Sequence, residues 1–328
     1  MPEKAGAART VWLWSENSYA TRGGREGLGG RLSRPPFLVP AGHHPLVLGG
    51  IRHNSAMGVL DWLRRDAPLL NVAGDTGSGP VVVMIHGIAS SSVTFHHLVP
   101  LLEPSHRCIT IDILGFGDSP APEGATYTLK EHVAALDRTI RSLGLRGPFT
   151  LVGHSLGSLI AARYAATHRR ELERLVLVSS PIYLPPSMLG DSVDRASMGA
   201  YFTVYEFLRL NPSFTQRTAA ALAAIAPIKN VLELTEKNWQ PFMLSLQNAI
   251  ESQTTLADLS RVRVPVDLVF GALDPFLAPG GLAIVQQLRH VRAHRVSGVA
   301  HIIRPKLAQA VAQVVAQPPA PGGSSNGE

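Results

Sequence analysis

Residues 153 to 157 read Gly-His-Ser-Leu-Gly, which is the G-x-S-x-G pattern of a nucleophile elbow. In an elbow a strand turns so sharply into a helix that the positions two residues either side of the nucleophile have no room for side chains. Gly153 and Gly157 meet this requirement. An apolar run at 148–152 precedes the pattern and an Ala- and Leu-rich helical stretch at 156–168 follows it, as an elbow requires. The pattern predicts that Ser155 Oγ is an attacking nucleophile.

A serine hydroxyl becomes a good nucleophile when a histidine accepts its proton and a carboxylate holds that histidine in one tautomer. Two segments after Ser155 supply these side chains at the ends of short apolar strands, where ligands approach an open α/β sheet. One strand ends in Gly-Ala-Leu-Asp274, and the other is followed by a glycine turn and His301. We therefore predict Asp274 as the acid and His301 as the base.

The competing acids and histidines have less suitable positions. Asp267 lies inside the first of these strands, and Asp258 precedes it. We expect His290 and His294 at a helix end and in the turn that follows. The earlier strand at 172–178 ends in Ser-Ser-Pro and offers no carboxylate as an alternative acid.

The negative oxygen of a tetrahedral intermediate needs preorganised hydrogen-bond donors. The backbone N–H of Leu156 opens the helix after the nucleophile and lies at the positive end of the helix dipole, so it is one predicted donor. The apolar strand at 81–85 ends in His86-Gly87-Ile88, and we expect the backbone N–H of Ile88 to be the second. His86 is expected to brace this loop through hydrogen bonds rather than to react.

These motifs together resemble the α/β-hydrolase superfamily, in its serine-dependent group of haloperoxidase-like esterases and carbon–carbon bond hydrolases. A further segment, Asp112-Ile-Leu-Gly-Phe-Gly-Asp-Ser119, is similar to the family's D-x-x-G-x-G-x-S loop. The resemblance covers roughly residues 69 to 317. It implies the triad order Ser, Asp, His, a structural role for Asp112, and chemistry without a metal or cofactor. Haloalkane dehalogenases and epoxide hydrolases of this fold attack with an aspartate, so Ser155 argues against both.

The resemblance also implies the fold: a mostly parallel central sheet with helices on both faces and an inserted helical cap. Apolar runs suit strands of a sheet that is covered on both sides. Thr128 and Glu131 predict a capping box at the start of a helix. We divide the chain into an atypical, partly flexible N-terminal extension (1–68), a core (69–182 and 258–317), a cap (183–257) and a disordered tail (318–328).

The cap is expected to select the substrate, and it holds a large share of the aromatic and Met residues. They either line an apolar pocket or pack the cap's own core. As a set they favour a hydrophobic acyl or aromatic substrate over a strongly charged one. The residues concerned are Tyr201, Phe202, Tyr205, Phe207, Trp239, Phe242 and Met243.

Composition restricts the partners. The net charge is +6, but the first seventy residues hold nine Lys or Arg against five acids, so the core is close to neutral and no nucleic-acid binding is expected. No apolar stretch reaches the roughly eighteen residues that span a bilayer, and no signal peptide is evident. The single cysteine, Cys108, lies in an apolar strand and is expected to pack in the core. We expect a cytoplasmic location; the oligomeric state is left open.

The sequence therefore predicts a serine hydrolase that cleaves an acyl bond of a small molecule, with a carboxylic ester as the first choice. Cleavage of a carbon–carbon bond in a vinylogous diketone uses the same triad, and thioesters and lactones suit the site equally. A different class of function is a ligand-binding protein that keeps the fold and pocket without catalysis.

Overall fold

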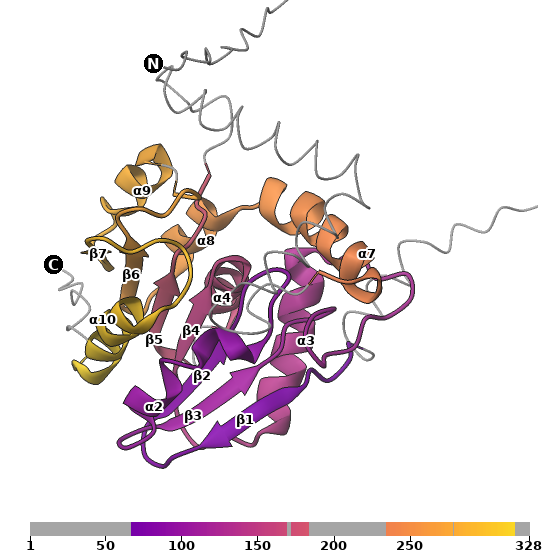
Figure 1. Cartoon of the computed structure of the whole chain (residues 1–328), viewed down its shortest axis with the longest axis horizontal. Coiled ribbons are helices and arrows are strands. Elements are labelled where there is room, and N and C mark those ends of the chain that lie inside the picture. The colour runs from indigo at the N-terminus through magenta and orange to yellow at the C-terminus, as the bar shows by residue number, and fades with distance from the viewer. Residues whose placement is uncertain (1–66, 169–171, 184–233, 278, 319–328) are drawn as a thin grey trace, which may run out of the picture. The chain divides into compact units, whose positions relative to one another are not determined.

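The computed structural model describes residues 67–168, 172–183, 234–277 and 279–318 (Figure 1). They form a sheet of seven strands in the order β1-β3-β2-β4-β5-β6-β7. β1 pairs antiparallel with β3, and the remaining pairs are parallel, which confirms the predicted fold class. The strands are β1 (Val72–Thr76), β2 (Val81–Ile85), β3 (Arg107–Ile111), β4 (Phe149–His154), β5 (Leu172–Val178), β6 (Val266–Gly271) and β7 (Val291–Val296).

Helices cover both faces of the sheet (Figure 1). One face carries the 3-10 helix η1 and the helices α2 and α10, whose apolar residues pack with one another. The other carries α3, α4 and α8. The helices are η1 (Ser92–Phe95), α2 (Val99–Leu102), α3 (Leu129–Ser142), α4 (Leu156–Thr167), α7 (Glu236–Ser245), the π-helix η3 (Leu246–Glu251), α8 (Thr255–Arg261), α9 (Pro279–Val285) and α10 (Pro305–Ala316).

The alternation of side chains along a strand explains why the central strands are apolar throughout. In β2, Val82 and Met84 pack on the face with α2 and α10, whereas Val83 and Ile85 pack on the opposite face. Successive residues of the strand therefore pack into the two cores on opposite faces of the sheet. Strands of this kind form only where helices lie on both sides, as they do here.

Two local predictions are confirmed. The Thr128 hydroxyl accepts a hydrogen bond from Glu131 N–H at the start of α3, and the Glu131 carboxylate accepts one from Thr128 N–H. Cys108 is buried in β3. Burial raises the pKa of its thiol to about 11, so the side chain stays protonated and packs as an apolar group.

The position predicted for His294 is wrong. His290 does lie in the turn before β7, but His294 lies within β7, with Nε2 2.7 Å from Asp267 Oδ1. Asp267 also lies 3.1 Å from Arg174 Nε, so a polar cluster that contains a buried ion pair joins β5, β6 and β7. β7 is the last strand of the sheet, and its exposed arginines hide the strand pattern. The strand-interior position of Asp267 is as predicted.

Several predictions lie outside the described residues. They include nearly all of the N-terminal extension, the C-terminal tail beyond residue 318, and the cap from 184 to 233 with Tyr201, Phe202, Tyr205 and Phe207. Within the described ranges, no helix has both the length and the apolar character to cross a bilayer.

Candidate active site

Ser155 lies at the junction of β4 and α4, with φ 51° and ψ −120°. A positive φ is uncommon for a residue with a side chain and strains the backbone unless its surroundings hold it. Here the Ser155 N–H donates to the Val178 carbonyl oxygen at 3.0 Å, and its own carbonyl accepts from Ser158 N–H at 2.9 Å. The turn is thereby fixed to the neighbouring strand and to the first turn of the helix.

The two glycines of the pattern allow backbone segments to approach closely. A Cβ placed on Gly153 would lie 2.4 Å from the Gly157 carbonyl oxygen. A Cβ on Gly157 would lie 2.4 Å from the carbonyl oxygen of His86 and 2.5 Å from that of Ile85. These distances are far inside van der Waals contact, so neither position accepts a side chain without moving the backbone.

His301 and Asp274, predicted as base and acid, lie side by side. His301 Nδ1 is 2.9 Å from Asp274 Oδ2 and 3.0 Å from Oδ1. Asp274 lies three residues after the end of β6, and His301 lies in the loop between β7 and α10. The ring of Phe276 meets the His301 ring edge-on, with centroids 4.7 Å apart. The imidazole is therefore held in one orientation by a carboxylate and an aromatic ring.

Asp274 is buried, and burial by itself raises the pKa of its carboxyl group. Hydrogen bonds outweigh this effect: His301 and the Phe276 N–H, 2.9 Å from Oδ1, both stabilise the ionised form. The net result is a pKa below the usual value. Asp274 is thus a carboxylate when His301 is neutral, as a residue that orients an imidazole must be.

The structure brings the elbow and the His301 loop together through His154, whose Nε2 lies 3.0 Å from the His301 carbonyl oxygen. Within the described part of the chain, Ser155 Oγ has no hydrogen bond to His301. Such bonds are often long without substrate and tighten in the complex.

One predicted oxyanion donor follows Ser155 in the chain, and the other follows a glycine that packs against Ser155. Leu156 is the first residue of α4, so its N–H has no acceptor within the helix. Gly87 lies against the nucleophile, because a Cβ on it would come within 2.8 Å of Ser155 Cβ. Ile88 follows directly, and its backbone N–H belongs to the loop that touches the elbow.

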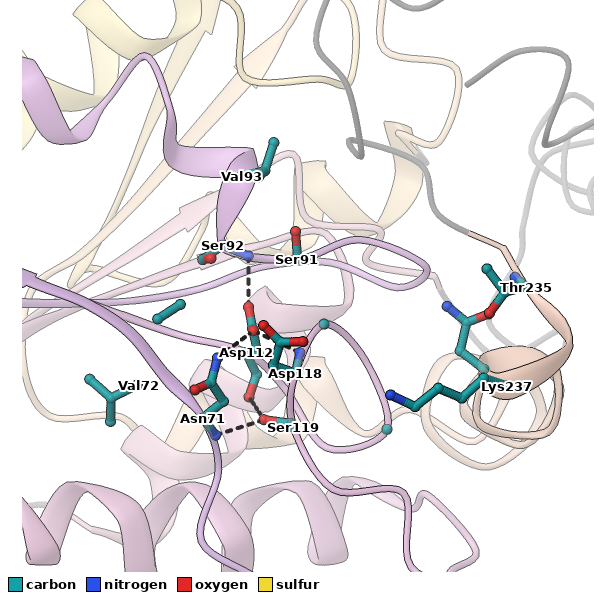
Figure 2. Close-up of a pocket in the computed structure, with 14 residues that line it drawn as sticks. Asn71, Val72, Ser91, Ser92, Val93, Asp112, Asp118, Ser119, Thr235 and Lys237 are labelled. Atoms are coloured by element: carbon teal, nitrogen blue, oxygen red, sulfur yellow. Dashed lines mark hydrogen bonds between the residues drawn. The ribbon is translucent and has the colours of Figure 1, made fainter. Parts of the chain in front are cut away.

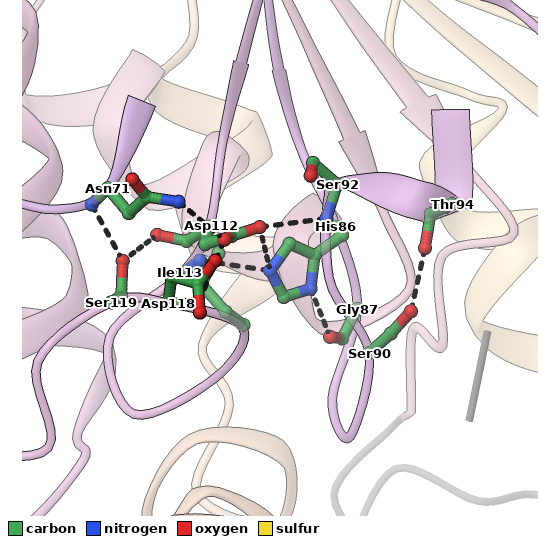
Figure 3. Close-up of polar contacts among 10 residues, drawn as sticks. All are labelled: Asn71, His86, Gly87, Ser90, Ser92, Thr94, Asp112, Ile113, Asp118 and Ser119. Carbon is green, nitrogen blue, oxygen red and sulfur yellow. Dashed lines mark hydrogen bonds and ion pairs between the residues drawn. The ribbon is translucent and has the colours of Figure 1, made fainter. Parts of the chain in front are cut away.

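His86 and Asp112 form a buried network that supports this loop (Figure 3). His86 Nδ1 donates to the Gly87 carbonyl oxygen at 2.8 Å, and Nε2 accepts from Ile113 N–H at 3.1 Å. Asp112 accepts hydrogen bonds from Ser92 N–H, Asn71 Nδ2 and Asp118 N–H. Burial alone raises the pKa of Asp112, but the hydrogen bonds from Asn71 Nδ2 and Asp118 N–H hold it well below the usual range. The side chains of His86 and Asp112 therefore hold the backbone of the neighbouring loops in place.

A polar cavity of about 580 Å³ lies beside this network (Figure 2). Its walls come from the start of β1, the loops that hold Ser92 and Asp112, and the start of α7, where Lys237 extends toward Asp118. None of Ser155, Asp274 and His301 lines it. The cavity belongs to the β3 and β1 side of the sheet, whereas the nucleophile follows β4.

Of the predicted cap residues, Trp239, Phe242 and Met243 are described and lie in α7. The Trp239 and Phe242 rings are 5.8 Å apart, and all three side chains pack against the main hydrophobic core. In the described ranges no group of three or more His, Cys, Asp or Glu side chains is arranged to hold a metal ion.

Comparison with known proteins identifies the family. Residues 80–303 match the family model described as the alpha/beta hydrolase fold. Since the match covers more than half of the chain, the protein belongs to the α/β-hydrolase family. This agrees with the seven-stranded, mostly parallel sheet and with the elbow after β4.

Relatives share parts of the chain. The cis-3-alkyl-4-alkyloxetan-2-one decarboxylase of Xanthomonas campestris pv. campestris is 39% identical over 116 residues, which is 33% of this chain and 39% of that protein. Lipase 1 of Psychrobacter immobilis is 25% identical over 227 residues, 66% of this chain and 68% of that protein. The chain spans well under half the length of the first curated relatives that it matches.

A solved esterase from Thermogutta terrifontis shares the fold, with a TM-score of 0.57 at 19% identity over 75% of this chain and 92% of that one.

Proposed function

We propose that the chain is a serine hydrolase that cleaves an acyl bond, most simply a carboxylic ester with an apolar acyl or aromatic group. The observation that carries this proposal is the contact between His301 Nδ1 and Asp274 Oδ2, which are 2.9 Å apart. The loop of His301 also contacts His154, the residue before Ser155. Relatives named lipase and a structural neighbour named esterase support an enzyme of the hydrolase class.

In the proposed mechanism Ser155 Oγ attacks the acyl carbon while His301 Nε2 accepts its proton. Asp274 stabilises the imidazolium through Nδ1. The N–H groups of Leu156 and Ile88 stabilise the oxyanion. The intermediate then collapses, the bond to the leaving group breaks, and His301 gives its proton to that group. Water repeats the sequence on the acyl-enzyme, releases the acid and restores Ser155.

An apolar substrate is favoured by the surroundings of the site. Leu273 and Phe276 flank the proposed acid in sequence and are 67% and 41% exposed, although both are large apolar residues.

We keep residues 183–257 as the proposed cap, of which α7 and η3 are the described part. The division into extension, core, cap and tail is a proposal on the same footing, as is the cytoplasmic location.

A lactone is the second candidate because one relative is named for an oxetan-2-one, which is a cyclic ester. The proposed triad would open a lactone by the same attack. Thioesters and vinylogous diketones stay as further alternatives. A binding protein without catalysis is the remaining alternative from another class.

The test is turnover of p-nitrophenyl esters of increasing chain length, beside a β-lactone, a thioester and a ring-cleavage diketone. We expect the highest kcat/KM with an apolar ester and a loss on the order of 10⁴-fold or more in Ser155→Ala. Ser260→Ala is the matched control, since Ser260 is an exposed serine on α8. Near-normal ester turnover by Ser155→Ala would refute the proposal.

A further inference from the structure

His154 immediately precedes the nucleophile and has no part in the mechanism above. Its side chain is buried, with 7% exposed, and Nε2 lies 3.0 Å from the carbonyl oxygen of His301, 147 residues further along the chain. We propose that His154 is a positioning residue: its Nε2–H hydrogen bond fixes the backbone of His301 relative to Ser155. This inference rests on the proposed roles of Ser155 and His301.

The chemistry of the contact fixes the state of His154. A carbonyl oxygen only accepts hydrogen bonds, so Nε2 carries the proton. Burial, and after it the charge that His301 can carry, lower the pKa of His154 to about 3. The ring is therefore neutral, and Nδ1 is a bare acceptor. This nitrogen is buried without a hydrogen-bond partner among the described residues.

An unpartnered buried nitrogen destabilises a fold, and an apolar side chain of similar size would avoid that cost. Stability alone thus gives no reason for a histidine here. The Nε2–H bond does give one, because it joins the end of β4 directly to the loop that carries the proposed base.

The segment before His301 is held by Leu273 N–H, which donates to the Val299 carbonyl oxygen at 2.9 Å, but this bond does not reach the backbone of His301. Its loop, between Val296 and Pro305, has no regular secondary structure. Asp274 and Phe276 hold the imidazole, but His154 Nε2 is the one hydrogen-bond donor to the His301 carbonyl within the described part of the chain. The two histidine rings also pack together, with centroids 5.0 Å apart. A shift of about 1 Å in a catalytic group can lower the rate by about 10²-fold.

The other edge of the His154 ring faces the oxyanion loop. A Cβ on Gly87 would come within 3.3 Å of His154 Nδ1. One neutral ring therefore lies between the loop of the proposed base and the loop of a proposed oxyanion donor. Because it stays neutral, it adds no charge that would oppose the imidazolium formed at His301.

The test compares His154→Gln, whose amide can replace the Nε2–H donor, with His154→Leu, which cannot donate. The matched control is His290→Leu, because His290 Nε2 lies 3.0 Å from the Leu259 carbonyl oxygen, at the opposite end of β7. One measurement is the rate constant for modification by a fluorophosphonate at about pH 8. The other is hydrogen–deuterium exchange of peptides covering 271–277 and 297–304, with melting temperature as a check of folding.

We expect His154→Leu to react about 10- to 100-fold more slowly and to exchange faster in both peptides, with His154→Gln within about threefold of wild type and His290→Leu unchanged. Wild-type rates and exchange in His154→Leu would overturn the inference. So would equal losses in the Leu and Gln variants, since the hydrogen bond would then not matter. A wild-type protein that does not react would overturn the proposed function instead, and the exchange data would still decide the role of His154.

Discussion

Acid should destabilise the protein through two buried histidines, and His132 in α3 makes this testable away from the proposed triad. His132 is 1% exposed, and its Nδ1 has no hydrogen-bond partner among the described residues. Burial lowers its pKa to about 3, as burial does for His154. In the unfolded chain each histidine has its usual pKa of about 6.5.

The sign follows from proton binding. Below about pH 6.5 the unfolded chain binds a proton at each histidine, whereas the folded chain does not until about pH 3. Stability is therefore fully present above pH 6.5 and is lost as the pH falls, by about 1.4 kcal/mol per unit for each histidine. From about pH 7.5 to 5.0 each loses about 2 kcal/mol, or about 4 kcal/mol for both.

The assay is urea unfolding at these two pH values for the wild type and His132→Phe, which keeps a ring but cannot titrate. We expect the variant to lose about 2 kcal/mol less on acidification. With a slope of about 3 kcal/mol/M, its midpoint should shift about 0.7 M less than that of the wild type. Identical acid dependence of the two proteins would refute the reasoning.

Three further results are expected. Asp274→Asn should lower kcat in ester assays on the order of 10³- to 10⁴-fold, because the imidazole loses its orienting carboxylate. The unfolding midpoint should change little. A loss of kcat below tenfold would contradict the assignment of Asp274. Gly157→Ala should destabilise the fold by about 3 kcal/mol or more in urea unfolding, because the new Cβ meets two backbone carbonyls. A wild-type midpoint would show that the end of β2 can move away at little cost. Arg174→Met should destabilise the fold by about 3–5 kcal/mol, since it leaves the Asp267 carboxylate buried without its arginine and leaves carbonyls at the end of α10 without a donor. A loss of stability under about 1 kcal/mol would mean that the cluster around Asp267 is not coupled to folding.

The parts of the fold that could be predicted are those with a local signal. Central strands such as β2 are apolar on both faces, and the capping box of α3 lies within four residues. β1 has no such signal: its sequence is Val-Ala-Gly-Asp-Thr, most of it is exposed, and its residues pair with residues 32 to 39 positions further along the chain. The prediction for His294 is wrong because β7 is an edge strand with exposed polar residues, which lack a strand pattern.

The candidate site divides in the same way. Glycine-containing turns at the ends of apolar strands predict Ser155, Asp274 and His301 as site residues. These turns can be recognised from a few neighbouring residues in the sequence. The contact of His154 with His301 spans 147 residues and has no motif, so only the three-dimensional structure reveals it. The same holds for the cavity between Asp118 and Lys237, whose walls come from four separate segments.

The central claim is that Ser155 is an activated nucleophile, and the most direct test is covalent labelling. The full chain would be treated with a fluorophosphonate and the modified peptide identified by mass spectrometry, beside Ser155→Ala and the control Ser260→Ala. We expect one adduct on Ser155 in the wild type and in Ser260→Ala, and none in Ser155→Ala. Modification of another serine, or an unmodified wild-type Ser155, would contradict it.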